Sequence, residues 1–324
     1  MEKNITPMVF AWTFVLLVGL SATQARGEQY DKSTPTPTLS EVRYGPHERN
    51  VLDFWRAKSE GPTPLVFIVH GGGWSGGNKE RADRFADIPK LLDAGISAVS
   101  INYRLIPRKP KENAEIDTTK NPPVHAPLHD AARALQFVRS KAEAWNIDKD
   151  RVGAAGGSAG ACSSLWLLYH DDLAEPDSDD PIARESTRLT CAAVMWGQTT
   201  LDPAQKKQWM PNSVYGGHAF GLKDFASFLA AREDIIPWIK QYSPYHNVTK
   251  DDPPAYLLYA RPPAMGQVKG DPTHSANYGV KLQEHCKELG VACELVYPGA
   301  KNVKHKTTTD YLIAVLKAQA VKGE

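Results

Sequence analysis

Short apolar runs alternate with amphipathic segments along most of the chain. Runs rich in β-branched and small apolar residues, bounded by Gly, Pro or polar residues, predict buried strands. Six such runs lie at 64–70, 97–105, 151–156, 191–197, 254–260 and 293–299. Segments with apolar residues at helical spacing stand beside these runs and predict helices. They lie at 79–95, 125–146, 158–170, 274–290 and 307–321.

This order of elements predicts the class of fold. Strands that alternate with helices are typical of a parallel sheet covered on both faces, and strands buried on both sides are almost continuously apolar. Residues 198–250 interrupt the rhythm with Pro203, Pro211, Pro237 and the glycine-rich stretch 215–221. We therefore expect an α/β fold with a mostly parallel central sheet and a small insertion near 198–250. Because ligands bind at the carboxyl ends of such strands, an insertion there would roof a pocket.

The N-terminal segment has the pattern of an export signal. Lys3 precedes an apolar run at 8–20, and small residues follow it. This run is shorter than the ~20 residues that span a bilayer, which favours a secretory signal peptide over an uncleaved anchor. We expect residues 1–27 to be the signal, 28–40 to be a flexible lead-in and 41–324 to form one domain. The mature protein is then secreted or periplasmic, without membrane contact after cleavage.

Composition and charge narrow the range of partners that the sequence predicts. Of 324 residues, 42% are hydrophobic and 23% charged, and the net charge is +1. No basic block is present, so nothing favours nucleic acid as a partner. The cysteines lack the spacing of a zinc site, and no metal is expected. The sequence leaves open whether Cys286 and Cys293 form a short disulfide or remain thiols. It also leaves the oligomeric state open.

The stretch GGSAG at 156–160 combines chemistry with a strand–turn–helix context. It fits the pattern G-x-S-x-G, in which a sharp turn exposes a serine between small neighbours. Ser158 is therefore the candidate nucleophile. The start of the following helix directs backbone N–H groups toward developing negative charge. A plain tight turn between a strand and a helix is the alternative interpretation.

A second motif, HGGGW, begins at His70 after an earlier predicted strand. Its glycines let the backbone turn its N–H groups toward a substrate. Gly72, Gly73 and Ala159 are the candidate oxyanion-hole donors, and His70 is expected to hold the loop. The segment 71–76 also satisfies the dinucleotide pattern G-x-G-x-x-G. The next predicted strand, however, ends without the acidic residue that would bind a ribose.

Together with NYRL at 102–105 and the segment 129–160, these motifs resemble the α/β-hydrolase superfamily. Within it they are most similar to HGGG-type esterases of the hormone-sensitive-lipase-like and BD-FAE feruloyl-esterase-like kinds, over about residues 40–320. The resemblance implies an α/β-hydrolase fold and a cofactor-free serine carboxylic ester hydrolase. It implies an acyl-enzyme mechanism with a triad in the chain order Ser, acid, His. With the export signal it points to small-molecule or polysaccharide esters, such as acetyl or feruloyl esters.

The same resemblance assigns the remaining triad members by position. Its histidine follows the last predicted strand, where His305 is the candidate, although PGAKNVKH replaces the usual PG-x-G-H. Its acid follows the preceding predicted strand, but prolines stand where that Asp belongs. Asp271 is the nearest substitute, and Asp202 is the alternative. His218 and His274 are expected either to line the pocket or to pack in loops.

The altered acid position also motivates a hypothesis of another class. In it, the chain is a catalytically weak or inactive α/β-hydrolase relative that binds carbohydrate or a partner. The absence of the usual Asp after the fifth predicted strand is the feature that supports it. Hydrolysis of a simple ester separates the two hypotheses.

Overall fold

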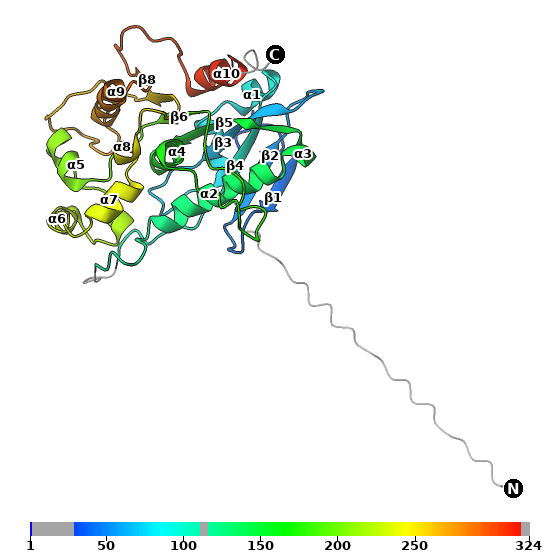
Figure 1. The fold of residues 1–324 in the computed structure, drawn as a ribbon, viewed down its shortest axis with the longest axis horizontal. Helices are drawn as coiled ribbons and strands as arrows, with labels where there is room; N and C mark the ends of the chain where they lie inside the picture. Colours follow the sequence, from blue (N-terminus) through cyan, green and yellow to red (C-terminus); the bar gives the residue numbers. More distant parts are fainter. Residues whose placement is uncertain (2–28, 111–115, 319–324) are drawn as a thin grey trace.

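An eight-stranded sheet forms the centre of the protein in the computed structural model, which describes residues 29–110 and 116–318 besides Met1 (Figure 1). The strand order is β1-β2-β4-β3-β5-β6-β7-β8. The pairs β1–β2 and β2–β4 are antiparallel, and all other pairs are parallel. The strands are β1 Leu39–Arg43, β2 Val51–Trp55, β3 Thr63–Val69, β4 Ser97–Ile101, β5 Ile147–Gly157, β6 Cys191–Met195, β7 Ala255–Leu258 and β8 Cys293–Val296.

The six predicted strands are all present, and they form the parallel part of the sheet. Every residue of β3 is buried between β4 and β5, which explains its continuous apolar sequence. β1 and β2 were not among the predicted strands. β2 is fully buried but carries Asp53, and most of β1 is exposed, so neither has a simple apolar pattern.

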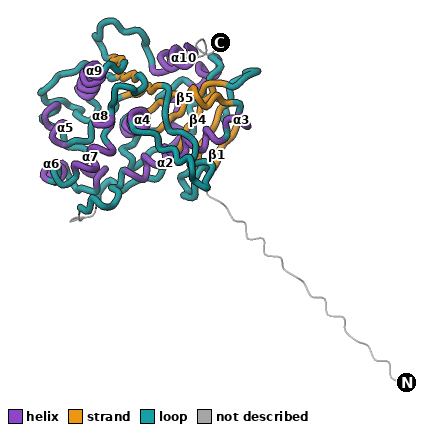
Figure 2. The backbone as a smooth tube through the Cα atoms, in the orientation of Figure 1, coloured by secondary structure: helices purple, strands orange, loops and turns teal. Residues whose placement is uncertain are grey.

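Helices cover both faces of the sheet, as the pattern predicted (Figures 1 and 2). On one face, Ile88 of α1 and Leu312 of α10 join Ile68 of β3 in a buried cluster. On the other face, Leu135 of α2 and Leu165 of α4 lie in a second cluster, which also includes α9. The α-helices are α1 Ile88–Asp93, α2 His125–Ser140, α3 Ala142–Trp145, α4 Ala159–Tyr169, α5 Pro203–Trp209, α6 Phe225–Ala230, α7 Ile236–Tyr242, α8 Pro244–Asn247, α9 Asn277–Leu289 and α10 Thr308–Ala318. Two short 3₁₀ helices are η1 Lys79–Arg84 and η2 Gly217–Phe220.

Three predicted helices have different bounds. The helix expected over 79–95 is divided into η1 and α1, because Asp87 caps a new helix by accepting from the Lys90 N–H at 3.0 Å. The helix expected over 125–146 ends at Ser140, and α3 follows it. The helix expected over 274–290 begins only at Asn277, so His274 lies in the preceding loop.

The insertion near 198–250 holds α5 to α8 and η2 between β6 and β7. It reaches the loop after β3, where His218 Nε2 forms a hydrogen bond of 2.9 Å with the Gly73 carbonyl oxygen. It therefore covers one end of the sheet, as expected from its prolines and glycines.

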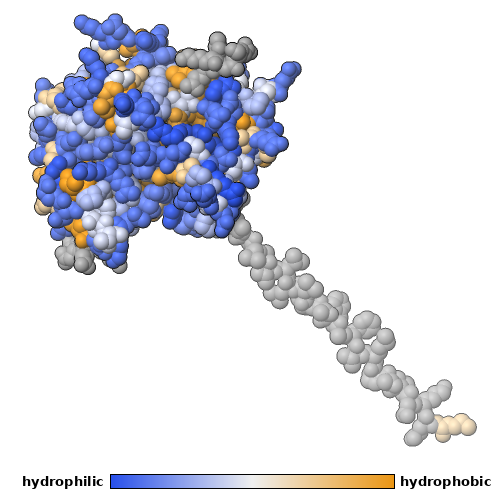
Figure 3. Space-filling view, viewed as in Figure 1, coloured by the Kyte–Doolittle hydropathy of each residue, from blue (hydrophilic) through white to orange (hydrophobic). Residues whose placement is uncertain are grey.

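The face seen in Figure 3 is largely hydrophilic, and its hydrophobic residues form small separate groups. No helix within the described ranges is long and apolar enough to cross a membrane. The predicted signal at 1–27 lies outside the described residues, apart from Met1. All four cysteines are free thiols, with Cys286 and Cys293 in hydrogen-bonding contact.

Candidate active site

Ser158 lies at the sharp turn between β5 and α4. Its φ of 54° and ψ of −117° are unusual for a non-glycine residue. A Cβ on Gly160 would lie 2.1 Å from the Val69 carbonyl oxygen, and one on Gly156 would lie 2.6 Å from the Gly160 backbone. Only glycine fits at these two positions, so the small residues of GGSAG are required by packing against β3.

Two side chains from one turn complete a hydrogen-bonded chain with this serine. The Nε2 atom of His274 lies 3.0 Å from Ser158 Oγ. Its Nδ1 atom lies 2.7 Å from Asp271 Oδ2. The second carboxylate oxygen accepts from the backbone N–H groups of Thr273 and His274, at 3.2 and 3.3 Å. A nucleophile bonded to a base, which is bonded to an orienting acid, is the arrangement that activates a serine.

His305 lies elsewhere, so its predicted position beside Ser158 is wrong. Its Nδ1 atom lies 2.8 Å from Glu294 Oε2, and its backbone N–H donates to the other oxygen of that carboxylate at 2.9 Å. The Tyr256 hydroxyl donates to its carbonyl at 3.2 Å. Glu294 on β8 thus fixes both the ring and the backbone of His305. The hollow that it lines does not include Ser158.

The two candidates for the acid of the triad, Asp271 and Asp202, have different surroundings. Asp202 caps α5 by accepting from the Ala204 N–H at 2.8 Å, and it forms an ion pair with Arg232 at 2.8 Å. Asp271 instead contacts His274. Burial raises the pKa of the Asp271 carboxyl, but the hydrogen bond and charge of His274 outweigh this effect and hold the pKa below its ordinary value. Asp271 is therefore ionised at neutral pH.

The glycine loop after β3 is shaped to present backbone N–H groups. The His70 Nδ1 atom forms a hydrogen bond of 2.7 Å with the Gly71 carbonyl oxygen, and the Ser75 N–H donates to the Gly72 carbonyl at 3.1 Å. In a trans peptide the N–H points opposite to the carbonyl. The N–H groups of Gly72 and Gly73 therefore point away from these internal contacts. Ala159, the first residue of α4, contributes an N–H that no preceding helical turn can accept.

Glycine is required in this loop as well. Gly72 has a φ of 116°, and a Cβ there would lie 2.2 Å from the Gly76 carbonyl oxygen. Gly73 has a φ of 63°, and a Cβ there would lie 2.2 Å from the Tyr215 hydroxyl. His218 supports the loop from the insertion, and burial lowers the pKa of its imidazole. A neutral His218 ring can donate one hydrogen bond to the Gly73 carbonyl without adding a charge behind the loop.

The loop and the hydrogen-bonded chain face one cleft. A cleft of about 650 Å³ is lined by the glycine loop, Ser158, Trp196, Tyr215, Asp271 and His274. A hollow of about 370 Å³ adjoins it and shares Trp196, Asp271 and His274. Trp196, with a φ of 55°, directly follows β6 and forms part of both walls. Volumes of this size are typical of small-molecule sites.

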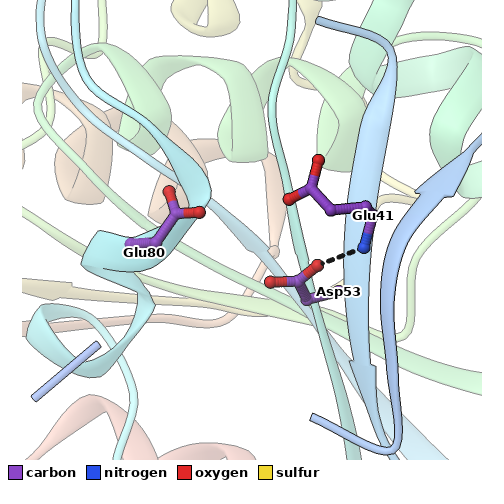
Figure 4. Close-up of side chains that lie close together, drawn as sticks. All are labelled: Glu41, Asp53 and Glu80. Carbon is purple, nitrogen blue, oxygen red and sulfur yellow. Dashed lines mark hydrogen bonds between the residues drawn. The ribbon is translucent and has the colours of Figure 1, made fainter. Parts of the chain in front are cut away.

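A separate carboxylate cluster holds a lysine ammonium. Glu41, Asp53 and Glu80 approach one another near the antiparallel edge of the sheet (Figure 4). The Lys79 ammonium lies 2.9 Å from Asp53 and 2.6 Å from Glu80, and it also contacts Glu41. The Tyr30 hydroxyl donates to Asp53 at 2.7 Å. Because the ammonium already occupies the position where these carboxylates converge, we interpret the cluster as a structural contact and not as a metal site.

The chain was compared with known proteins. The BD-FAE family model matches residues 52–261. The chain is 27% identical over 265 residues to the probable carboxylic ester hydrolase LipM of Mycobacterium tuberculosis, covering 79% of this chain and 54% of that protein. The chain spans about half the length of the curated relatives that it matches. These relatives support the prediction that the chain is an esterase.

Solved structures support the fold. A truncated carbohydrate esterase from gut microbiota superposes with a TM-score of 0.61 at 20% identity, covering 83% of this chain and 90% of that chain. An acetyl ester-xyloside bifunctional hydrolase from Caldicellulosiruptor lactoaceticus gives a TM-score of 0.54 at 22% identity, with coverage of 84% and 87%. The predicted α/β-hydrolase fold is thus confirmed.

The histidine that lies beside Ser158 is His274, whereas the sequence predicted His305 at this place. His274 had been expected to line the pocket or to pack in a loop, and it lies against Ser158. The signal was its spacing from Asp271, since a turn brings residues three apart within hydrogen-bonding reach. The two side chains still follow Ser158 in the order acid, then histidine.

Proposed function

The chain belongs to the BD-FAE family, and from this premise we propose that it is a serine carboxylic ester hydrolase with Ser158, His274 and Asp271 as its triad. One observation carries the proposal: the continuous contacts of 3.0 and 2.7 Å that join hydroxyl, imidazole and carboxylate. A serine hydroxyl is a weak nucleophile at neutral pH unless a base within hydrogen-bond reach takes its proton. In the proposed reaction His274 is that base, because its Nε2 atom lies within hydrogen-bond reach of the serine hydroxyl.

The reaction follows from the positions of these groups. Ser158 Oγ attacks the ester carbonyl carbon while its proton moves to His274 Nε2. The carbonyl oxygen becomes an oxyanion that accepts hydrogen bonds from the N–H groups of Gly72, Gly73 and Ala159. His274 then gives the proton to the departing alcohol, leaving an acyl-enzyme. Water, deprotonated by the same imidazole, hydrolyses the acyl-enzyme and restores the serine.

Asp271 has an orienting role in this scheme. Its carboxylate accepts from His274 Nδ1–H, which keeps Nε2 unprotonated and directed at Ser158. It also stabilises the imidazolium that forms as the serine loses its proton. A side chain that is 52% exposed can carry out this role because the turn itself fixes the carboxylate.

We further propose that the substrate is an ester of a carbohydrate and that the protein acts outside the cytoplasm. The similar structures named carbohydrate esterase and acetyl ester-xyloside hydrolase support the first point. The signal pattern at 1–27 supports the second. Acetyl and feruloyl groups are the acyl groups to test. The cleft of about 650 Å³ and the adjoining hollow of about 370 Å³ together offer space for an acyl group and a sugar.

The test is hydrolysis of 4-nitrophenyl acetate by the purified protein. We expect Ser158→Ala and His274→Gln each to lower kcat/KM by about 10³-fold or more. His305→Gln is the matched control and is expected to change it by less than about threefold, because its ring contacts Glu294. If wild-type protein and Ser158→Ala gave the same background rate, the proposal would be replaced by the non-catalytic binder.

A further inference from the structure

Cationic side chains surround the candidate active site. Arg81, Arg84 and Arg108 line the cleft that contains Ser158. Arg261 and Lys269 line the adjoining hollow. Across these two linings Asp271 is the acidic residue, and its carboxylate already contacts His274.

This local excess of positive charge does not follow from the composition. The whole chain has 38 Lys and Arg residues against 37 Asp and Glu residues. The cations come from separate segments: η1 supplies two, the loop after β4 supplies one, and the chain after β7 supplies two. Their convergence on one cleft is therefore a property of the fold. Clefts lined by one sign of charge raise the local concentration of ligands of the opposite sign.

Two of these arginines are positioned to contact a substrate. Arg84 and Arg108 are exposed, and neither forms an ion pair with another described residue. Arg84 precedes Phe85, whose ring packs so closely against Gly157 that a Cβ there would lie 2.2 Å away. Arg84 therefore borders the turn that holds Ser158.

Arg108 lines the same cleft from the loop after β4. Its charge acts on Tyr215 and on His218, the residues that support the glycine loop. Burial raises the pKa of Tyr215 to about 12, and the Arg108 charge opposes that shift. A ligand that reaches Ser158 through this cleft therefore meets a lining that contains both guanidinium groups.

We propose that the esters hydrolysed at this site carry a carboxylate close to the scissile bond, as in acylated saccharides that contain uronic acids. Guanidinium groups bind carboxylates through paired, charge-assisted hydrogen bonds. This inference rests on the proposed esterase function and adds a charge requirement for the substrate. Arg84 and Arg108 are the residues expected to bind the carboxylate.

Two chromogenic esters with the same acetyl group test the proposal. 4-Nitrophenyl acetate is neutral, and 5-acetoxy-2-nitrobenzoate adds one carboxylate to the same nitrophenol. For the double variant Arg84→Gln/Arg108→Gln, we expect kcat/KM for the anionic ester to fall about tenfold relative to that for the neutral ester. Comparing each ester with itself across variants cancels the difference in leaving groups. Arg43→Gln, on β1, is the matched control and should leave the ratio unchanged.

A second measurement uses sugar substrates. Acetylated oligogalacturonides should be deacetylated faster than acetylated xylo-oligosaccharides, and the preference should shrink as salt rises from 20 to about 500 mM, because salt screens exposed charges. If both nitrophenyl esters are hydrolysed and their ratio is the same in wild type and double variant, the charge requirement is wrong while the esterase function stands. If neither ester is hydrolysed above the Ser158→Ala background, both proposals fall together.

Discussion

Ser158 reaches the cleft because glycines allow β5 and α4 to approach the end of β3. At the scale of single residues, such contacts explain why GGSAG and HGGGW are recognisable in the sequence. A substituent at Gly160 would meet the backbone carbonyls of Val69 and His70 within 2.1 and 2.6 Å. Backbone atoms in a packed sheet cannot move aside cheaply.

Gly160→Ala is therefore expected to lower the free energy of unfolding by about 1–3 kcal/mol, the usual cost of overpacking, and to reduce esterase activity by displacing Ser158. Urea denaturation with a parallel ester assay measures both effects. Gly61→Ala is the matched control, because nothing lies within 4 Å of its added Cβ. Equal stability of the two variants would contradict this account of the turn.

The two candidate acids should separate catalysis from stability. Asp271→Asn is expected to lower kcat by about 10⁴-fold, by removing the acceptor that fixes the His274 tautomer, with little loss of stability at a half-exposed site. Asp202→Asn weakens an ion pair in which the carboxylate is only 1% exposed. It should lower the free energy of unfolding by about 1–3 kcal/mol while kcat changes by less than about threefold. The opposite pattern in kinetics and denaturation would return Asp202 to the triad.

The serine and the glycines could be predicted because they stand in short continuous motifs, whereas the histidine depends on a contact between residues 116 apart. Nothing near His305 in the sequence reveals that Glu294 holds it. The turn from Asp271 to His274 was visible, but only the folded chain shows that it reaches Ser158.

At the scale of elements, the predictions succeeded where burial is uniform and failed where polar residues interrupt it. The parallel strands were all predicted, because each contains an apolar run, such as the whole of β3 and the buried second half of β5. β2 was missed because its buried Asp53 requires a partner, Lys79, from a distant segment. Helix bounds shifted where a capping residue such as Asp87 starts a new helix within an apolar pattern.

Helix α5 in the insertion carries a buried lysine that should make stability depend on pH. Lys206 is fully buried, its ammonium contacts Gln198, and it lies 5.4 Å from the Tyr278 ring centre. Burial lowers the pKa of Lys206 from 10.5 to about 7. Between these pKa values the lysine of the unfolded chain is protonated, whereas that of the folded chain is neutral. The free energy of unfolding therefore rises with pH in this range, by at most about 1.4 kcal/mol per pH unit.

Denaturation of wild type and Lys206→Met at pH 7.5 and 9.5 tests this expectation. The free energy of unfolding of the wild type should increase more steeply with pH than that of the variant. Lys207→Met, at the exposed neighbouring position, should run parallel to the wild type. Parallel slopes for Lys206→Met would show that the lysine titrates normally.

At the scale of the whole molecule, the candidate active site and the Lys79 cluster, in which Lys79 contacts Glu41, Asp53 and Glu80, occupy different parts of one sheet. The carboxyl ends of β3, β5, β6 and β7 lead into the loops that form the cleft. The antiparallel edge is joined to η1 through Lys79, whose ammonium contacts the three carboxylates drawn in Figure 4. η1 also supplies Arg81 and Arg84 to the cleft, so this contact supports one wall of the candidate site.

The Lys79 cluster yields a final prediction, which distinguishes an ion-pair junction from a cation site. Lys79 and Asp53 have side chains that are each only 3% exposed, so Lys79→Met would leave a buried carboxylate without its counter-charge. Such a loss costs about 3–5 kcal/mol, which should appear as a lower denaturation midpoint. EDTA should leave the melting temperature of the wild type unchanged, and added Ca²⁺ should not restore the variant. A melting temperature that falls with EDTA would instead mean that a metal ion contributes to this edge of the sheet.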